Sequence, residues 1–216
     1  MPARIRVIPA ILTDDPRKLA AMVRQAETYA GYVQLDIMDG RFVPSRSITC
    51  QQAAAVSFAI PWEVHLMVEK PEQQLECFKQ AGAHKTIFHY EATDSAGEVI
   101  AQARRLGLEV GLAVNPETPV SAVLPLTKEV DSVLFLAVHP GFYGARFLPE
   151  VLGKIAELRR FRPGMEIGID GGVKENNIKL VAGSGVNDIY VGSAIFLDSQ
   201  PADAFRRLQA LANEAV

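Results

Sequence analysis

The length of the chain suits one globular domain with a sizeable core, and its charge excludes several classes of partner. It has 216 residues, of which 49% are hydrophobic and 22% charged, and its formal net charge is −3. We therefore expect a soluble protein with no nucleic-acid partner and no membrane partner. No apolar run approaches the roughly 18 residues that a membrane span needs, and no signal-peptide core is present at the start. The expected localisation is cytoplasmic.

Two cysteines, Cys50 and Cys77, form neither a CxxC motif nor the framework of a disulfide-rich domain. Sparse cysteines of this kind are typical of proteins in a reducing compartment. The sequence therefore predicts buried or inert thiols.

Strand-like and helix-like segments alternate along the whole chain. In chain order, the predicted strands are residues 5–10, one ending at Asp36, one ending at Met67, 85–89, 109–114, 132–138, one ending at Asp170, and 188–191. The segment Asp14-Asp15-Pro16 is expected to cap the first helix, which carries apolar residues at i, i+3, i+4 and i+7. Later helices are expected over 48–58, from Pro71, up to Gly107, after Pro119, from Leu148 and near the C-terminus.

Eight βα units with strand ends roughly 21 to 32 residues apart predict a compact barrel. We expect an α/β fold, a (β/α)₈ TIM barrel, with residues 1–216 as a single domain. An open, doubly wound sheet is the rival, but it usually carries a glycine-rich turn after the first strand. Here the glycine-rich turns come late, so the barrel is favoured.

Ionisable side chains stand near the ends of three predicted strands: Asp36, His65 and Asp170. In a barrel, functional residues lie at the C-terminal strand ends, so these three are expected to meet. Two carboxylates and an imidazole suit a divalent metal such as zinc, manganese or iron. They also suit removal of a proton from one face of a substrate carbon and its return to the other. Each residue alone has a structural alternative, as a loop cap or a hydrogen-bonded core histidine.

The late glycines predict a phosphate site, because glycine lets backbone N–H groups approach an anion. Met38 and Met67 are expected near the same opening, as an apolar floor under a planar intermediate or as ordinary core residues. The residues of the predicted phosphate site are Gly141, Phe142, Tyr143, Gly144, Gly171, Gly172, Gly192 and Ser193.

Several segments, in order along the chain, resemble motifs of the ribulose-phosphate 3-epimerase family. They are the DIMDGRFVP segment from Asp36, the VHLM segment from Val64, the NPETP turn from Asn115, the PGFYGARF segment from Pro140, the DGGV segment from Asp170 and the VGSAIF segment from Val191. The resemblance implies an isomerase of carbohydrate metabolism, with a pentose phosphate type of substrate, that inverts C3 of a ketose phosphate resembling ribulose 5-phosphate. The reaction would run by Asp/Asp proton transfer through a metal-stabilised enediolate.

Carried over residue by residue, Asp36 and Asp170 would be the acid/base pair and metal ligands. His65 would be a metal ligand that also binds substrate, and the glycines would hold the phosphate. The implied cofactor is a divalent ion (Zn, Fe, Mn or Co), and a homo-oligomer is expected.

The chain departs from the family pattern at the site itself. Gln34 stands where a metal-ligating histidine is usual, Ala10 replaces a serine, and Leu136 replaces a methionine. The amide oxygen of Gln34 would still be a ligand, although it suits harder ions better than zinc. These changes leave two alternatives open: a non-catalytic phosphosugar-binding barrel, or another isomerase or lyase acting on a sugar phosphate.

Overall fold

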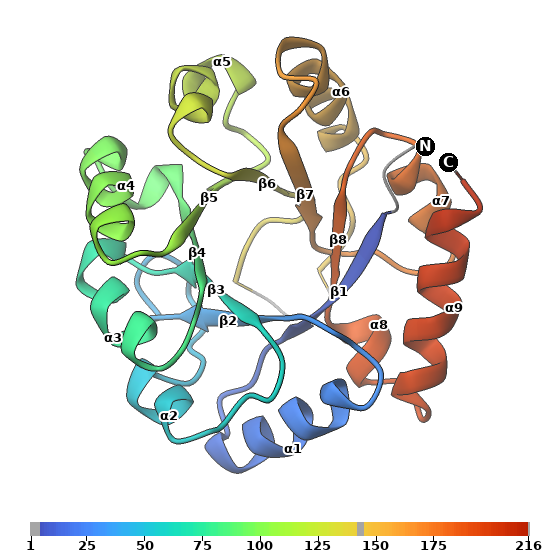
Figure 1. Cartoon of the computed structure of the whole chain (residues 1–216). Helices are drawn as coiled ribbons and strands as arrows, with labels where there is room; N and C mark the ends of the chain where they lie inside the picture. Colours follow the sequence, from blue (N-terminus) through green and yellow to red (C-terminus); the bar gives the residue numbers. More distant parts are fainter. Residues whose placement is uncertain (1–4, 142–144, 216) are drawn as a thin grey trace.

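The computed structural model describes residues 5–141 and 145–215, which form a closed parallel barrel with β8 paired to β1. Seen along the barrel axis in Figure 1, the strands surround the centre and the helices form an outer ring. The predicted (β/α)₈ fold is confirmed. The strands are β1 (Arg6–Ile11), β2 (Val33–Met38), β3 (Trp62–Met67), β4 (Lys85–His89), β5 (Glu109–Val114), β6 (Ser132–Leu136), β7 (Glu166–Asp170) and β8 (Asp188–Val191).

The helices cover the outside of this barrel. They are α1 (Pro16–Glu27), α2 (Cys50–Ala54), α3 (Leu75–Gln80), α4 (Ala96–Arg105), α5 (Val120–Val123), α6 (Val151–Phe161), α7 (Ile178–Ala182), α8 (Ser193–Phe196) and α9 (Pro201–Asn213), with short 3₁₀ helices η1 (Pro71–Gln73), η2 (Tyr90–Ala92) and η3 (Leu124–Lys128). Helix α1 begins as predicted, because the Asp15 side chain accepts the backbone N–H of Arg17. None of the helices in the described part of the chain has the length and apolarity needed to cross a membrane.

Some boundaries differ from the sequence prediction. Strand β2 runs to Met38, two residues past Asp36, while β6 ends at Leu136 rather than at 138. The helix predicted over 48–58 is only Cys50–Ala54, which Thr49 opens through a capping box with Gln52. Apolar residues continue beyond the true ends of β6 and α2, so hydrophobicity alone does not mark where an element ends.

The prediction of free thiols is wrong. Cys50 and Cys77 form a disulfide across 27 positions of sequence. It joins α2 to α3, two helices that pack side by side on the outside of the barrel. The spacing of two cysteines in a sequence does not reveal such a bond, because packing of the two helices brings the side chains together.

Alternation along β2 sends its side chains in opposite directions. Val33 and Leu35 pack outward into the large core between barrel and helices, whereas Gln34 and Asp36 face the barrel interior. The interior is filled by a smaller apolar cluster: Ile8, Ala10, Ile87, Ala113, Leu134, Leu136 and Tyr190. Polar side chains therefore occupy the barrel at its two ends, with hydrocarbon between them.

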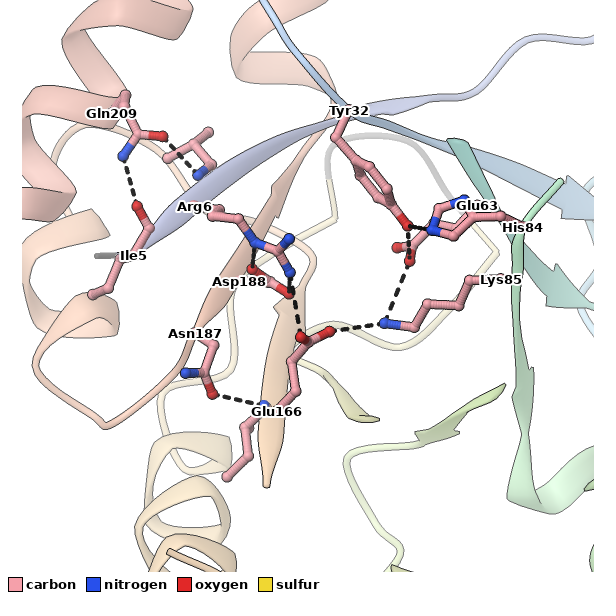
Figure 2. Close-up of polar contacts among 12 residues, drawn as sticks. Ile5, Arg6, Tyr32, Glu63, His84, Lys85, Glu166, Asn187, Asp188 and Gln209 are labelled. Atoms are coloured by element: carbon pink, nitrogen blue, oxygen red, sulfur yellow. Dashed lines mark hydrogen bonds and ion pairs between the residues drawn. The ribbon is translucent and has the colours of Figure 1, made fainter. Parts of the chain in front are cut away.

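Charged side chains fill the end of the barrel at which the strands begin (Figure 2). Arg6 donates to both carboxylate oxygens of Asp188, at 2.6 and 2.7 Å. Lys85 lies 2.9 Å from Glu166 and 3.5 Å from Glu63. We call these five residues the basal ion network. In barrels of this kind, residues at the N-terminal ends of the strands contribute to stability and not to catalysis.

Candidate active site

The three predicted strand-end residues do meet at the C-terminal mouth of the barrel. Strand register places Asp36 beside His65, and Asp170 follows at the end of β7. One oxygen or nitrogen from each of the three lies within 4.8 Å of the others. Side chains separated by up to 134 positions (170 − 36) thus form a single cluster, which we call the mouth cluster.

His65 links the two carboxylates of the mouth cluster. Its Nδ1 lies 3.0 Å from Oδ1 of Asp36 and 3.6 Å from Oδ2 of Asp170, and its side chain is fully buried. Its other nitrogen, Nε2, lies 3.0 Å from Nε2 of His89. His89, the last residue of β4, thus makes a hydrogen bond with the central imidazole.

Burial and charge shift the protonation of this cluster in a consistent way. Burial raises the pKa of Asp36 to about 6, although hydrogen bonds from His65 and Gln34 oppose the shift. Burial would lower the pKa of His65, but hydrogen bonds to Asp170 and Asp36 outweigh it and raise the pKa to about 9. At neutral pH the imidazole of His65 is therefore protonated in the metal-free cluster, and the site is ready to exchange that proton for a cation.

Gln34 lies beside the mouth cluster, as its position on β2 predicts. Its amide nitrogen donates to Asp36 at 3.0 Å and lies 3.5 Å from Asp170. Its Oε1 is buried and has no hydrogen-bond partner among the described residues. Rotation of the amide would turn this oxygen toward the carboxylates, which is favourable only with a cation between them. The donor set of two carboxylates, one imidazole and an amide oxygen fits a divalent metal.

A single cavity joins the mouth cluster to the late glycines. Asp36 and Asp170 line it, and so do both predicted methionines, Met38 and Met67. His65 and Gln34 are fully buried and lie behind the carboxylates, outside the lining. The lining residues from the predicted phosphate site are Gly141, Gly171, Gly172, Gly192 and Ser193.

Two of these positions require glycine for steric reasons. Gly171 and Gly172 have φ of +106° and +68°, a region that other residues rarely adopt. A Cβ on Gly172 would lie 2.9 Å from the backbone of Phe147, and one on Gly171 would lie 2.5 Å from Val138. The cavity wall after β7 is thus bare backbone. Phe142, Tyr143 and Gly144 lie outside the described residues.

Sequence reasoning missed two residues at this end of the barrel. Tyr190 on β8 lines the cavity, and Glu91 in η2 faces His89, with Oε2 at 3.5 Å from Nδ1. The sequence could have indicated Glu91, because this acid follows by two residues a histidine that ends a buried strand.

Fold and site together define the class: a (β/α)₈-barrel enzyme with an acid–imidazole–acid cluster at the catalytic end of the barrel. Comparison with known proteins narrows the class. The model of the ribulose-phosphate 3-epimerase family matches residues 6–196. The chain belongs to this family.

Curated relatives of similar length agree with this placement. A ribulose-phosphate 3-epimerase of Mycobacterium bovis is 35% identical over 97% of this chain and 93% of its own length. The enzyme of the same name from Schizosaccharomyces pombe is 33% identical, covering 94% and 92%. The cytoplasmic isoform of Oryza sativa is 34% identical, covering 96% and 94%.

Solved structures confirm the fold at much lower sequence identity. The KGPDC of Streptococcus mutans superposes with a TM-score of 0.77 at 12% identity, covering 98% of both chains. The 3-hexulose-6-phosphate synthase of Salmonella typhimurium has a TM-score of 0.75 at 14% identity and covers 98% of this chain and all of that one. At such identity the likeness concerns the barrel alone.

Proposed function

We propose that this protein is a sugar-phosphate epimerase that inverts C3 of a ketose phosphate resembling ribulose 5-phosphate. One observation carries the proposal: Asp36 and Asp170 present their carboxylates to the same cavity, with His65 bonded between them. An epimerase needs two such groups, one to remove a proton and one to return it to the opposite face. Family membership supplies the reaction class and the substrate class.

In this proposal, Asp36 and Asp170 exchange protons with C3. The raised pKa of Asp36, about 6, lies near neutral pH, where a group transfers protons efficiently in both directions. His65 holds the two carboxylates in place from behind. A divalent cation held by Asp36, His65 and Asp170 would supply the positive charge that lowers the free energy of an enediolate.

The rest of the cavity would bind the remainder of the substrate. Backbone N–H groups after β7 and β8 would hold the phosphate, because Gly171, Gly172 and Gly192 leave the backbone open to an anion. Met38 and Met67 lie together in one apolar cluster and would form the floor under the planar intermediate. His65 is proposed as a ligand of the metal and, through it, a contact of the substrate.

Isotope exchange tests the reaction directly. The protein, loaded in turn with Zn²⁺, Mn²⁺, Fe²⁺ or Co²⁺, is incubated with D-ribulose 5-phosphate in deuterated water and followed by proton NMR. We expect loss of the C3 proton signal and appearance of the 3-epimer, and neither in the Asp170→Asn variant. Binding of the sugar phosphate with no exchange under any metal would favour a non-catalytic binding protein instead.

The identity of the metal is a separate proposal that depends on Gln34. An amide oxygen is a poorer ligand for zinc than imidazole and suits harder ions better. We therefore expect the wild-type protein to prefer Mn²⁺ over Zn²⁺ relative to a Gln34→His variant. Competition between the two ions, measured by metal analysis after dialysis, tests this. An unchanged Zn/Mn ratio in Gln34→His would contradict a role for Gln34 at the metal.

Three further expectations belong to the same proposal. We expect residues 1–216 to form a single (β/α)₈ domain. The localisation is cytoplasmic, as in the name of the Oryza sativa relative, although a disulfide is more usual in oxidising compartments. A homo-oligomer is expected, and sedimentation analysis tests it.

A further inference from the structure

We infer that Glu91 and His89 are positioning residues, which orient the imidazole of His65 so that its Nδ1 lone pair is available to a divalent cation in the mouth cluster. The inference rests on the proposed function, because it concerns the metal site of that proposal. It extends the site from the cavity wall outward through two side chains to the NPETP turn, Asn115–Pro119.

The contact between the two histidines couples their tautomers. Nε2 of His65 and Nε2 of His89 lie 3.0 Å apart, and the ring planes differ by only 19°. Only one of the two nitrogens can carry the proton of this hydrogen bond. If His89 donates, a neutral His65 carries its proton on Nδ1 and has no lone pair to offer a cation. If His65 donates, its Nδ1 is free to bind.

Glu91 selects the second arrangement. A carboxylate only accepts hydrogen bonds, so its Oε2, 3.5 Å from Nδ1 of His89, favours a proton on that nitrogen. His89 then has its lone pair on Nε2 and accepts from Nε2 of His65. At 3.5 Å the contact is an ion-pair distance and does not meet hydrogen-bond geometry, and Nδ1 of His89 has no hydrogen-bond partner among the described residues.

Glu91 is itself held in place from two sides. Its Oε1 accepts the backbone N–H of Asn115 at 2.9 Å and the hydroxyl of Thr118. The same turn is fixed from behind by Lys154 of α6, which donates to the carbonyl oxygens of Pro116 and Thr118. The NPETP turn therefore has a physical role, because it anchors the carboxylate of Glu91, the outermost of the three side chains Glu91, His89 and His65. We call these three side chains the relay.

His89 is fixed by packing as well as by its contacts with His65 and Glu91. Its side chain is fully buried, and the ring of Phe42 lies 4.9 Å from its own, centroid to centroid. The order Glu91, His89, His65 then runs from the outer surface, where the Glu91 side chain is 23% exposed, to the cluster. Outer partners that orient a metal-bound histidine commonly contribute a factor of 10 to 100 in metal affinity.

The first experiment measures metal affinity. Dissociation constants for Zn²⁺ and Mn²⁺ are obtained by calorimetry with a competing chelator for the wild type, Glu91→Gln and Glu98→Gln. Glu98 is an exposed acid that lines the same outer pocket as Glu91, so its variant controls for the lost charge. We expect Glu91→Gln to bind 10- to 100-fold more weakly and Glu98→Gln to bind within about twofold of the wild type. Equal affinities in all three would overturn the inference.

The second experiment reads the tautomers directly and needs no variant. Long-range ¹⁵N–¹H NMR of the wild-type imidazoles, Zn²⁺-loaded and also metal-free above pH 9 where His65 is neutral, should place the ring proton of His89 on Nδ1 and that of His65 on Nε2. A proton on Nε2 of His89 would overturn the inference. This readout decides the matter if Glu91→Gln does not fold. It also separates the two proposals: a wild type that binds no metal contradicts the proposed metal site, while the metal-free tautomers still test the relay.

Discussion

The two ends of the barrel both carry buried charges, and they balance those charges differently. In the basal ion network each carboxylate touches Arg6 or Lys85, whose charges are permanent at neutral pH. In the mouth cluster two carboxylates share one imidazole, whose charge depends on pH and on whether a metal replaces its proton. The positive charges of the base are therefore always present, whereas the positive charge of the mouth depends on a proton or a bound cation.

Both ends leave a buried side-chain oxygen without a hydrogen-bond partner among the described residues, Oε1 of Gln34 at the mouth and Oε1 of Glu63 at the base. At the mouth, the unpartnered oxygen of Gln34 lies next to a cavity where a ligand enters. At the base, Tyr32 extends the network by contacting Glu63 at 2.9 Å and His84 at 3.0 Å, as Figure 2 shows. Lys85 and Tyr32 already contact Glu63 through its other oxygen, whereas the unpartnered oxygen of Gln34 lies beside the carboxylates that line the cavity.

The largest expected effect comes from removing a charge at the mouth. Asp36→Asn should lower kcat/KM for epimerisation by about 10²–10⁴-fold, because a proton-transfer group is lost. The unfolding free energy of the metal-free protein should change by less than about 1 kcal/mol, because the desolvation cost of a buried carboxylate is removed together with its hydrogen bonds. Steady-state kinetics and urea unfolding measure the two quantities. Asp94→Asn, on the exposed outer surface, is the control, and wild-type kcat/KM in Asp36→Asn would refute the assignment.

Removing a charge at the base should produce the opposite pattern. Lys85→Met deprives Glu63, which is fully buried, and Glu166 of their shared cation. Breaking a buried pair in this way costs about 3–5 kcal/mol of stability. The activity of the molecules that remain folded should be unchanged. Urea unfolding with kinetics at low temperature tests this, and the exposed Lys128→Met is the matched control. Destabilisation no greater than that of the control would show that the basal network is dispensable.

The smallest expected effect, and the one that sharpens the comparison most, is the pH dependence of metal binding at the mouth. His65, with its pKa raised to about 9, holds a proton at pH 7 that a metal must displace. The apparent affinity should therefore rise by up to about tenfold per pH unit from pH 7 and level off above pH 9. Calorimetry in two buffers of different ionisation enthalpy should show release of about one proton at pH 7. Binding without proton release would mean that the imidazole is neutral before the metal arrives.

Much of the fold followed from local pattern. The alternation in β2, the caps of α1 and the regular return of apolar strands predicted a barrel, because each depends on neighbours a few residues apart. The register of a closed parallel barrel then places every strand end at one rim. For that reason the meeting of Asp36, His65 and Asp170 was predictable, although no local interaction joins them.

Other features depended on contacts between distant segments. Packing of α2 against α3 brings Cys50 to Cys77, and the NPETP turn of the β5–α5 connection reaches Glu91 after β4. The direction of the Gln34 amide, toward the carboxylates through its nitrogen, also depends on groups from another strand.

The sequence by itself determined the order of strands and helices, the face of each strand on which the acids lie, and the end of the barrel where they gather. Only the tertiary structure decided which buried charges are paired, which cysteines are bonded and which side chains stand behind His65. The physical reason is the separation along the chain of the residues that interact. Backbone periodicity is set by neighbouring residues, whereas hydrogen bonds and ion pairs among buried groups are set by atoms within a few ångströms, whatever their separation along the chain.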